Sequence, residues 1–143
     1  MTTRRLFLRL LIVGAVVTAA LAAAKRDRPA KVQRYGMVIG VKADKLDQYK
    51  RLHANPWPSV NKMLKECNIQ NYSIYLTQFD DGKWYLFSYF EYTGSDFEAD
   101  MKKMGADPAT QRWWKETDPC QIALRNRKPG QWWKAMDEVY HLD

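Results

Sequence analysis

Residues 71–92 read NYSIYLTQFDDGKWYLFSYFEY, and this stretch decides the fold. Its two halves, residues 71–77 and 83–92, are rich in aromatic and aliphatic side chains and flank a turn signal at Asp80-Asp81-Gly82. Asp-Gly between two such segments is typical of a tight turn that joins neighbouring antiparallel strands. The stretch therefore predicts a β-hairpin that forms the two central strands of a sheet.

A strand and a helix are predicted on the N-terminal side of this hairpin. Every second position from 35 to 41 holds Tyr, Met, Ile or Val, which is the periodicity of a strand. After Asp44, which we expect to cap the helix, apolar side chains recur at steps of three or four residues. That spacing places them on one side of a helix, facing the sheet. The members of this stripe are Leu46, Tyr49, His53, Trp57, Val60, Leu64 and Cys67.

Two prolines, Pro56 and Pro58, lie within this apolar stripe. Each proline removes a backbone hydrogen-bond donor and crowds the carbonyl group four residues earlier in the helix. We therefore expect the helix to kink, or to stop and restart, just after His53.

Further helices and a strand are predicted on the C-terminal side of the hairpin. A helix follows from Ser95, capped by Ser95 or Asp96, and another helical segment covers residues 108–114 and ends before Pro119. The last strand covers residues 135–142. The order βαββαβ predicts an α+β fold of the ferredoxin-like type, with helices on one face of an antiparallel sheet. Because the other face would be bare, we expect two copies to pack sheet to sheet as a homodimeric α/β-barrel.

The net charge of +7 belongs to the N-terminal part of the chain. Residues 1–34 hold eight of the 23 lysines and arginines and one of the 16 acidic residues, so residues 35–143 hold 15 of each and are neutral. A nucleic-acid-binding protein needs a basic surface that neutralises phosphates. The charge distribution therefore argues against nucleic acid as a partner.

Residues 1–24 predict an export signal. Arg4 and Arg5 precede an uncharged apolar run of 15 residues, 10–24, which ends in alanines. The run is shorter than the ~20 residues that span a bilayer, which favours a cleaved signal over an uncleaved membrane anchor. The paired arginines resemble a twin-arginine signal, with an ordinary secretory signal as the alternative. We expect residues 25–34 to be a basic linker, residues 35–143 to be the catalytic domain, and the protein to reach the periplasm or the outer face of the inner membrane.

The chain has two cysteines, Cys67 and Cys120, which could pair in an oxidising compartment. Cys67 lies on the apolar helix stripe, where a small buried thiol is the simpler interpretation. No CxxC or HExxH spacing occurs, so the sequence predicts no dedicated metal site.

The candidate chemistry centres on Tyr49 and His53. At positions i and i+4 of one helix, a phenol and an imidazole lie one above the other, and the imidazole can exchange protons near neutral pH. A structural histidine bonded to the backbone is the alternative. Tyr72 on the hairpin should enter the same core, and the Trp113-Trp114 pair offers aromatic faces of the kind that stack on a sugar ring.

Five segments, in this order, resemble the L-rhamnose mutarotase family. They are residues 34–39 (RYGMVI), 49–53 (YKRLH) followed by Trp57-Pro58, 71–76 (NYSIYL), 111–114 (QRWW) and 138–142 (EVYHL). The resemblance implies a homodimeric ferredoxin-like barrel, a histidine proton donor at the position of His53, and sugar contacts from the positions of Tyr49, Tyr72, Trp113 and Trp114. The leader departs from the family pattern and leaves the identity of the sugar open. The segment 115–134, with Asp118-Pro119-Cys120 and the Trp132-Trp133 pair, also has features of its own; these could line or cap the pocket, and no role is assigned to them.

Mutarotation would proceed without a cofactor. It opens the pyranose by protonating the ring oxygen while a base takes the proton of the anomeric hydroxyl group, and we expect His53 to be the acid. The base is not assigned. Two alternatives remain open: a sugar-binding module without catalysis, and another activity on the same barrel, such as a cofactor-free oxygenase of small aromatic molecules.

Overall fold

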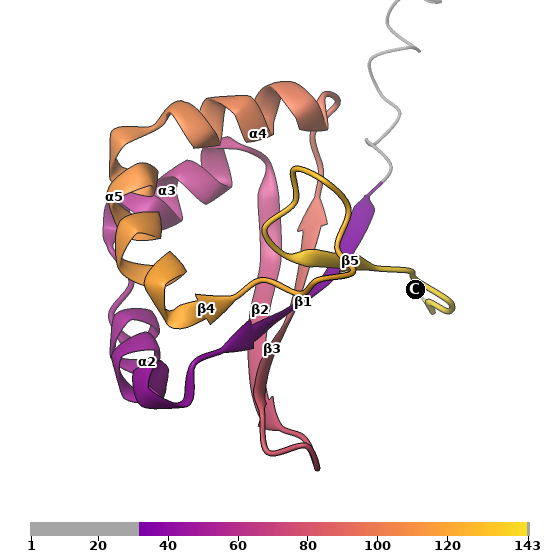
Figure 1. Ribbon diagram of the computed structural model, residues 1–143. Coiled ribbons are helices and arrows are strands. Elements are labelled where there is room, and N and C mark those ends of the chain that lie inside the picture. The colour runs from indigo at the N-terminus through magenta and orange to yellow at the C-terminus, as the bar shows by residue number, and fades with distance from the viewer. Residues whose placement is uncertain (1–31, 143) are drawn as a thin grey trace, which may run out of the picture. The chain divides into compact units, whose positions relative to one another are not determined.

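A computed structural model describes residues 32–142 of the chain (Figure 1). The predicted leader, residues 1–24, and residues 25–31 of the predicted linker lie outside the described residues. The described part runs through β1 (Gln33–Val41), the short 3-10 helix η1 (Ala43–Lys45), α2 (Leu46–Ala54), α3 (Pro58–Glu66), β2 (Ile69–Gln78), β3 (Trp84–Tyr92), α4 (Phe97–Ala106), α5 (Pro108–Thr117), the 3-10 helix η2 (Asp118–Cys120), β4 (Gln121–Ile122) and β5 (Lys134–Met136).

The strands form one antiparallel sheet in the order β2-β3-β1-β4, and β5 also pairs with β1. The β2–β3 hairpin confirms the prediction from residues 71–92. Its turn places Gly82 at φ 74°, a left-handed conformation that favours glycine. β1 pairs with β3 along its whole length, from Gln33 opposite Tyr92 to Val41 opposite Trp84.

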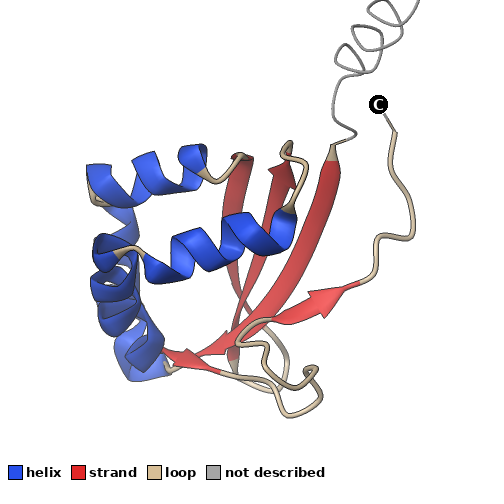
Figure 2. Ribbon diagram, turned by 90° about the horizontal axis from the view of Figure 1, so that it is seen from above, coloured by secondary structure: helices blue, strands red, loops and turns tan. Residues whose placement is uncertain are grey.

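The four α-helices cover one face of this sheet, as predicted (Figure 2). Alternate strand residues face the helices, and Ile39 of β1 and Leu86 of β3 are almost completely buried there. Burial of one such side chain contributes about 1.5–3 kcal/mol to folding. Tyr49 of α2 and Cys120 of η2 belong to the same buried cluster, so the face that carries the stripe of α2 is part of the core.

The helices begin and end close to the predicted positions, with one error. α2 ends at Ala54 and α3 begins at Pro58, which confirms the predicted interruption after His53. Asp96, rather than Ser95, caps α4, because its side chain accepts a hydrogen bond from the amide of Ala99. Asp44 was wrongly predicted as a cap: it lies within η1, and Lys45 precedes α2 without a side-chain cap.

The last strand is shorter than predicted. β5 covers only Lys134–Met136, whereas residues 135–142 were expected to be a strand. Residues 137–142 have no strand neighbour within the described part of the chain, and Val139, Tyr140 and Leu142 are exposed. β4, which contains only Gln121–Ile122, was not predicted.

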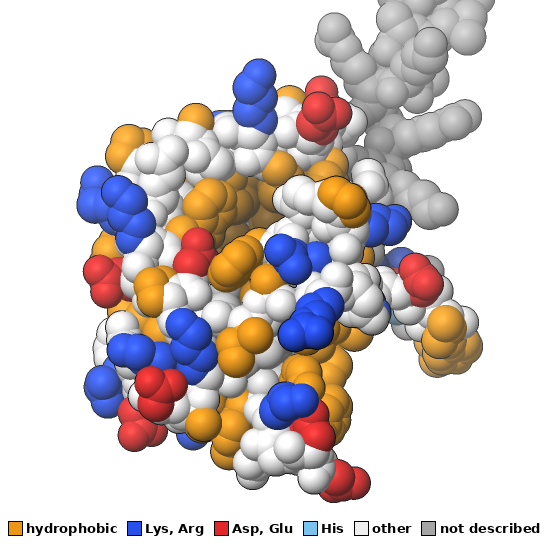
Figure 3. All heavy atoms as spheres, viewed as in Figure 1, with side chains coloured by type: hydrophobic (Ala, Val, Ile, Leu, Met, Phe, Trp, Pro, Cys, Tyr) orange, Lys and Arg blue, Asp and Glu red, His pale blue; other side chains and the backbone are white. Residues whose placement is uncertain are grey.

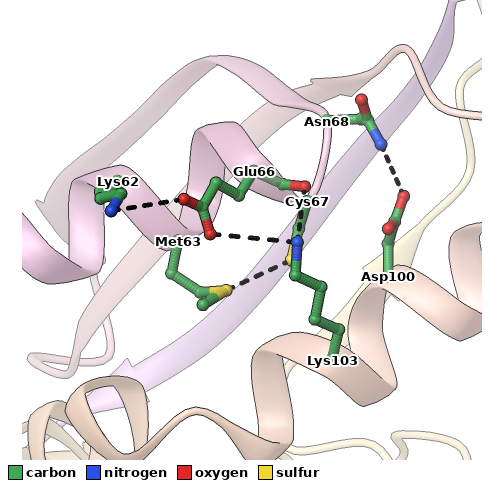
Figure 4. Close-up of polar contacts among 7 residues, drawn as sticks. All are labelled: Lys62, Met63, Glu66, Cys67, Asn68, Asp100 and Lys103. Atoms are coloured by element: carbon green, nitrogen blue, oxygen red, sulfur yellow. Dashed lines mark hydrogen bonds and ion pairs between the residues drawn. The ribbon is translucent and has the colours of Figure 1, made fainter.

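Both cysteines are buried free thiols. Cys67 ends α3, and its Sγ lies 3.6 Å from Sδ of Met63 (Figure 4). The next residue, Asn68, has a positive φ of 58° and donates a hydrogen bond of 2.8 Å to Asp100 of α4. The hydrogen bond from Asn68 to Asp100 thus joins the C-terminal end of α3 to α4.

Among residues 32–142, no helix combines the length and apolar character that crossing a membrane requires.

Candidate functional site

A cavity of about 660 Å³ lies between the helices and the sheet, a size typical of small-molecule sites. Figure 3 shows a recess there with hydrophobic side chains in its walls. The five residues predicted for the site all line this cavity, and they come from three elements: Tyr49 and His53 from α2, Tyr72 from β2, and Trp113 and Trp114 from α5. The structure therefore brings all five together, although they are far apart in sequence.

His53 lies in an aromatic cluster. Its ring stacks on Tyr49, with ring centres 4.1 Å apart and planes 25° apart. Trp113 contacts the imidazole edge to face at 5.3 Å, and Trp57 contacts Trp113 in the same way at 5.4 Å. The i, i+4 spacing on α2 produces the stack, and α5 supplies the wall beside it.

The backbone determines which nitrogen of His53 is available. Nδ1 lies 3.0 Å from the carbonyl oxygen of Tyr49. Because a carbonyl oxygen only accepts hydrogen bonds, Nδ1 carries a hydrogen and Nε2 is the nitrogen left for a bound molecule. Burial lowers the pKa of His53, and this backbone hydrogen bond raises it in part. The neutral imidazole is therefore the main form at neutral pH.

The Tyr49 hydroxyl group lies near a partly buried hydrogen bond between Gln121 and Trp132 that the sequence does not reveal. Nε1 of Trp132 donates to Oε1 of Gln121 at 2.6 Å, and the side chain of Gln121 lies close enough to the Tyr49 hydroxyl group to lower its pKa.

The hydroxyl group of Tyr49, which lines the cavity, keeps its hydrogen and can donate it to a bound molecule. Burial, with a smaller contribution from nearby Tyr72, raises the pKa of Tyr49 far above its ordinary value. Tyr49 is therefore a permanent phenol. No motif in the sequence marks Gln121, because only the fold brings β4 beside α2 and the segment that precedes β5.

Tyr72 and the tryptophan pair have both buried and exposed parts. Tyr72 is 40% exposed, yet burial raises the pKa of its hydroxyl to about 12, so the exposed part is not the hydroxyl end. Trp113 is 7% exposed and Trp114 is 38% exposed. Trp113 thus contributes to the core, and Trp114 offers an aromatic face to a molecule that enters from solvent.

Polar groups are few in the cavity. Asp118, at the start of η2, is the only Asp, Glu, Lys or Arg among the described residues that line it. Across residues 32–142, no three His, Cys, Asp or Glu side chains are grouped so that they could hold a metal ion. The lining is therefore suited to a neutral molecule with apolar surface and several hydroxyl groups.

Comparison with known proteins agrees with this description. A family model for L-rhamnose mutarotase matches residues 34–142. The L-rhamnose mutarotase of Oceanobacillus iheyensis is 31% identical over 112 residues, which cover 78% of this chain and 100% of that protein. The L-rhamnose mutarotase of Bacillus subtilis is 32% identical over 114 residues, with the same coverage of both chains.

The fold also matches a solved structure. The crystal structure of an L-rhamnose mutarotase from Formosa agariphila has a TM-score of 0.57 to this protein, with 18% identity, and the match covers 78% of this chain and 99% of that chain. At this identity the likeness shows the fold, and the family follows from the sequence matches. The chain belongs to the L-rhamnose mutarotase family.

Proposed function

We propose that this protein is a mutarotase that interconverts the α and β anomers of an aldose such as L-rhamnose. The family match carries the proposal, because the matched residues 34–142 include every side chain that the reaction would use. The cavity supports it, since a volume of about 660 Å³ with a mostly apolar, aromatic lining suits one pyranose ring.

The chemistry consists of proton transfers and uses no cofactor. His53 protonates the ring oxygen through Nε2, the C1–O5 bond breaks, and the open aldehyde closes on its other face. The minor imidazolium form of His53 supplies the proton, and the neutral form takes a proton back on closure. A positioned acid or base contributes typically 10²- to 10⁴-fold, which is sufficient for a reaction that already proceeds in water.

Four other side chains orient the sugar in this mechanism. Tyr49 donates its hydroxyl hydrogen to a sugar oxygen, and Tyr72 binds a second hydroxyl group. Trp113 and Trp114 pack against the CH face of the ring. The apolar contacts hold the ring in place while the phenols select its orientation.

The functional form in this proposal is a homodimer with a ferredoxin-like barrel. The sheet face away from the helices carries exposed apolar side chains, among them Tyr75, 66% exposed, and Phe79, 50% exposed. Ring centres of Phe79 and Tyr85 lie 5.0 Å apart on this face. A second copy packed on it would remove this apolar surface from water.

The protein works outside the cytoplasm in this proposal. Residues 1–24 have the order of an export signal, with paired arginines before a short apolar run. The sugar would then be met in the periplasm or at the outer face of the inner membrane, with membrane contact only through an uncleaved leader.

Anomer exchange measured by magnetisation-transfer NMR tests the function. Purified full-length protein is added to L-rhamnose, L-fucose and other common aldoses, beside His53→Ala at the same concentration. We expect faster exchange for at least one sugar, with most of the acceleration lost in the variant. Tight binding of a sugar without faster exchange would instead identify a sugar-binding module.

A further inference from the structure

Mutarotation needs a second proton-transfer group besides His53. When the ring opens, one group gives a proton to the ring oxygen and another takes the proton of the anomeric hydroxyl group. The titratable side chains that line the cavity are Tyr49, His53, Tyr72 and Asp118. Both tyrosines are poor bases, because burial raises their pKa values and keeps them protonated. Asp118 is the group that remains.

Asp118 is placed to meet a bound sugar. It follows α5 directly and lies four residues after Trp114, so the two side chains are one helical turn apart on the same face. The amide of Asp118 donates to the carbonyl oxygen of Trp114, which continues the helical geometry to this residue. The turn Asp118–Cys120 packs against α2, the helix that carries His53.

The carboxylate of Asp118 has no structural partner. Within residues 32–142 it takes part in no hydrogen bond or ion pair, although the residue is half-buried. Three other carboxylates of α4 and α5 accept hydrogen bonds within the fold. Asp96 and Asp107 cap α4 and α5. Asp100 accepts hydrogen bonds from Asn68 and Tyr92. A partly buried carboxylate without a partner is costly, and in a cavity it indicates a role toward a bound molecule.

We propose that Asp118 is the second acid-base residue of the reaction and accepts the proton of the anomeric hydroxyl group. This inference rests on the proposed function. As the O1–H proton moves to the Asp118 carboxylate, a C1=O1 double bond forms and the C1–O5 bond breaks, with its electron pair going to O5. O5 takes a proton from His53. After rotation about C1–C2, the reverse transfers close the ring on the other face and restore both residues.

The environment of the two groups suits this exchange. Burial raises the pKa of Asp118 and lowers the pKa of His53, so the two values move toward each other. The transfer of a proton from His53 to O5, together with the transfer of the O1 proton to Asp118, then costs little free energy. Four charged side chains lie near the turn that follows Asp118: Lys42, Asp44, Lys45 and Glu116. Nζ of Lys42 donates a hydrogen bond of 2.7 Å to the backbone carbonyl oxygen of Pro119, and not to the carboxylate of Asp118.

The variant Asp118→Asn tests the inference, with Glu116→Gln as the matched control on an exposed face of α5. Exchange rates are measured by NMR at saturating and half-saturating concentrations of the sugar whose anomer exchange the wild-type protein accelerates. We expect kcat of Asp118→Asn to fall at least 100-fold, with KM changed by less than a few-fold, and Glu116→Gln to match the wild-type protein. The exchange rate of the wild-type protein should decline toward acid pH. The residual activity of Asp118→Asn should not show this decline.

Chemical rescue supplies an independent readout. Formate added to Asp118→Ala should restore part of the exchange rate, because a small carboxylate can occupy the vacated space. Both Asp118 variants should remain folded, because in the described part of the chain the side chain of Asp118 makes no hydrogen bond or ion pair that either substitution would remove. Near-ultraviolet circular dichroism checks this.

The outcomes separate the two proposals. A wild-type protein that accelerates no aldose contradicts the proposed function itself. An active wild-type protein with Asp118→Asn at more than half its kcat, or with only KM raised, overturns the assignment of Asp118 as the base.

Discussion

The imidazole of His53 is enclosed by two aromatic rings and bonded to the backbone, and this environment sets its protonation. Burial lowers the pKa of His53 from its ordinary value of 6.5, so His53 binds a proton more readily in the unfolded chain than in the folded protein. The contribution of His53 to the free energy of unfolding is then greatest at high pH and declines as the pH falls through about 6.5.

His53→Gln should remove this pH dependence. We expect the wild-type free energy of unfolding to decrease from pH 7.5 to pH 5 more steeply than that of the variant, as measured by urea titration at each pH. The other histidine, His141, is present in both proteins, so the difference isolates His53. Parallel curves over this range would contradict the lowered pKa.

The Gln121–Trp132 hydrogen bond allows a second prediction at this scale. Gln121→Leu and Trp132→Phe each remove one partner of the 2.6 Å bond, and the double variant removes both. A double-mutant cycle on the free energy of unfolding should give a coupling of about 1 kcal/mol. A coupling below about 0.3 kcal/mol would mean that the bond contributes nothing to stability.

Sequence reasoning found the site residues that belong to recognisable patterns. Tyr49 and His53 repeat at helical spacing, and Trp113-Trp114 stand out by composition. Asp118 lies in the 3-10 helix η2 and Gln121 in the two-residue strand β4. The sequence indicates that this part of the chain could line or cap the pocket, but only the fold determines which of its side chains reach the cavity.

The elements themselves follow mostly from local signals. Asp81-Gly82 fixed the hairpin, and Pro56 with Pro58 divided the apolar stripe into α2 and α3. β4 is too short to show a period, and the predicted last strand failed beyond Met136 because alternation alone does not supply a neighbouring strand to pair with. A local sequence pattern therefore predicts a strand well when the strand that pairs with it lies in the same segment, as in the β2–β3 hairpin.

The N-terminus of α4 tests capping directly. Asp96→Ala should lower the free energy of unfolding by about 1 kcal/mol, because the Ala99 amide loses its acceptor. Ser95→Ala is the adjacent control and should change it by less than half of that. Thermal and urea unfolding measure both; equal losses would show that the cap is not Asp96 alone.

At the scale of the whole molecule, the sheet separates two surfaces with different roles. One face of the sheet lies under the helices (Figure 2) and forms the floor of the cavity. The other face carries exposed aromatic side chains. The first supports the proposed chemistry and the second supports the proposed dimer, so the two can be tested apart.

Tyr75→Lys should disrupt the dimer without unfolding the chain. Tyr75 is 66% exposed in the single chain, so the folded monomer has little to lose, whereas a lysine placed in an apolar interface would be left without a partner. Sedimentation velocity should show a dimer for the wild-type protein and a monomer for the variant. Lys115→Glu, on the exposed surface of α5, is the control and should remain dimeric; a monomeric wild-type protein would refute the assembly.

The central claim is that His53 drives exchange between sugar anomers. The most direct test dissolves crystalline α-L-rhamnose in cold buffer and follows its approach to anomeric equilibrium by NMR, with wild-type protein, with His53→Ala, and without protein. The account predicts a rapid approach with the wild-type protein and a rate near the protein-free value with the variant. Equal acceleration by both proteins would contradict the role of His53, and no acceleration by either would contradict mutarotation of this sugar.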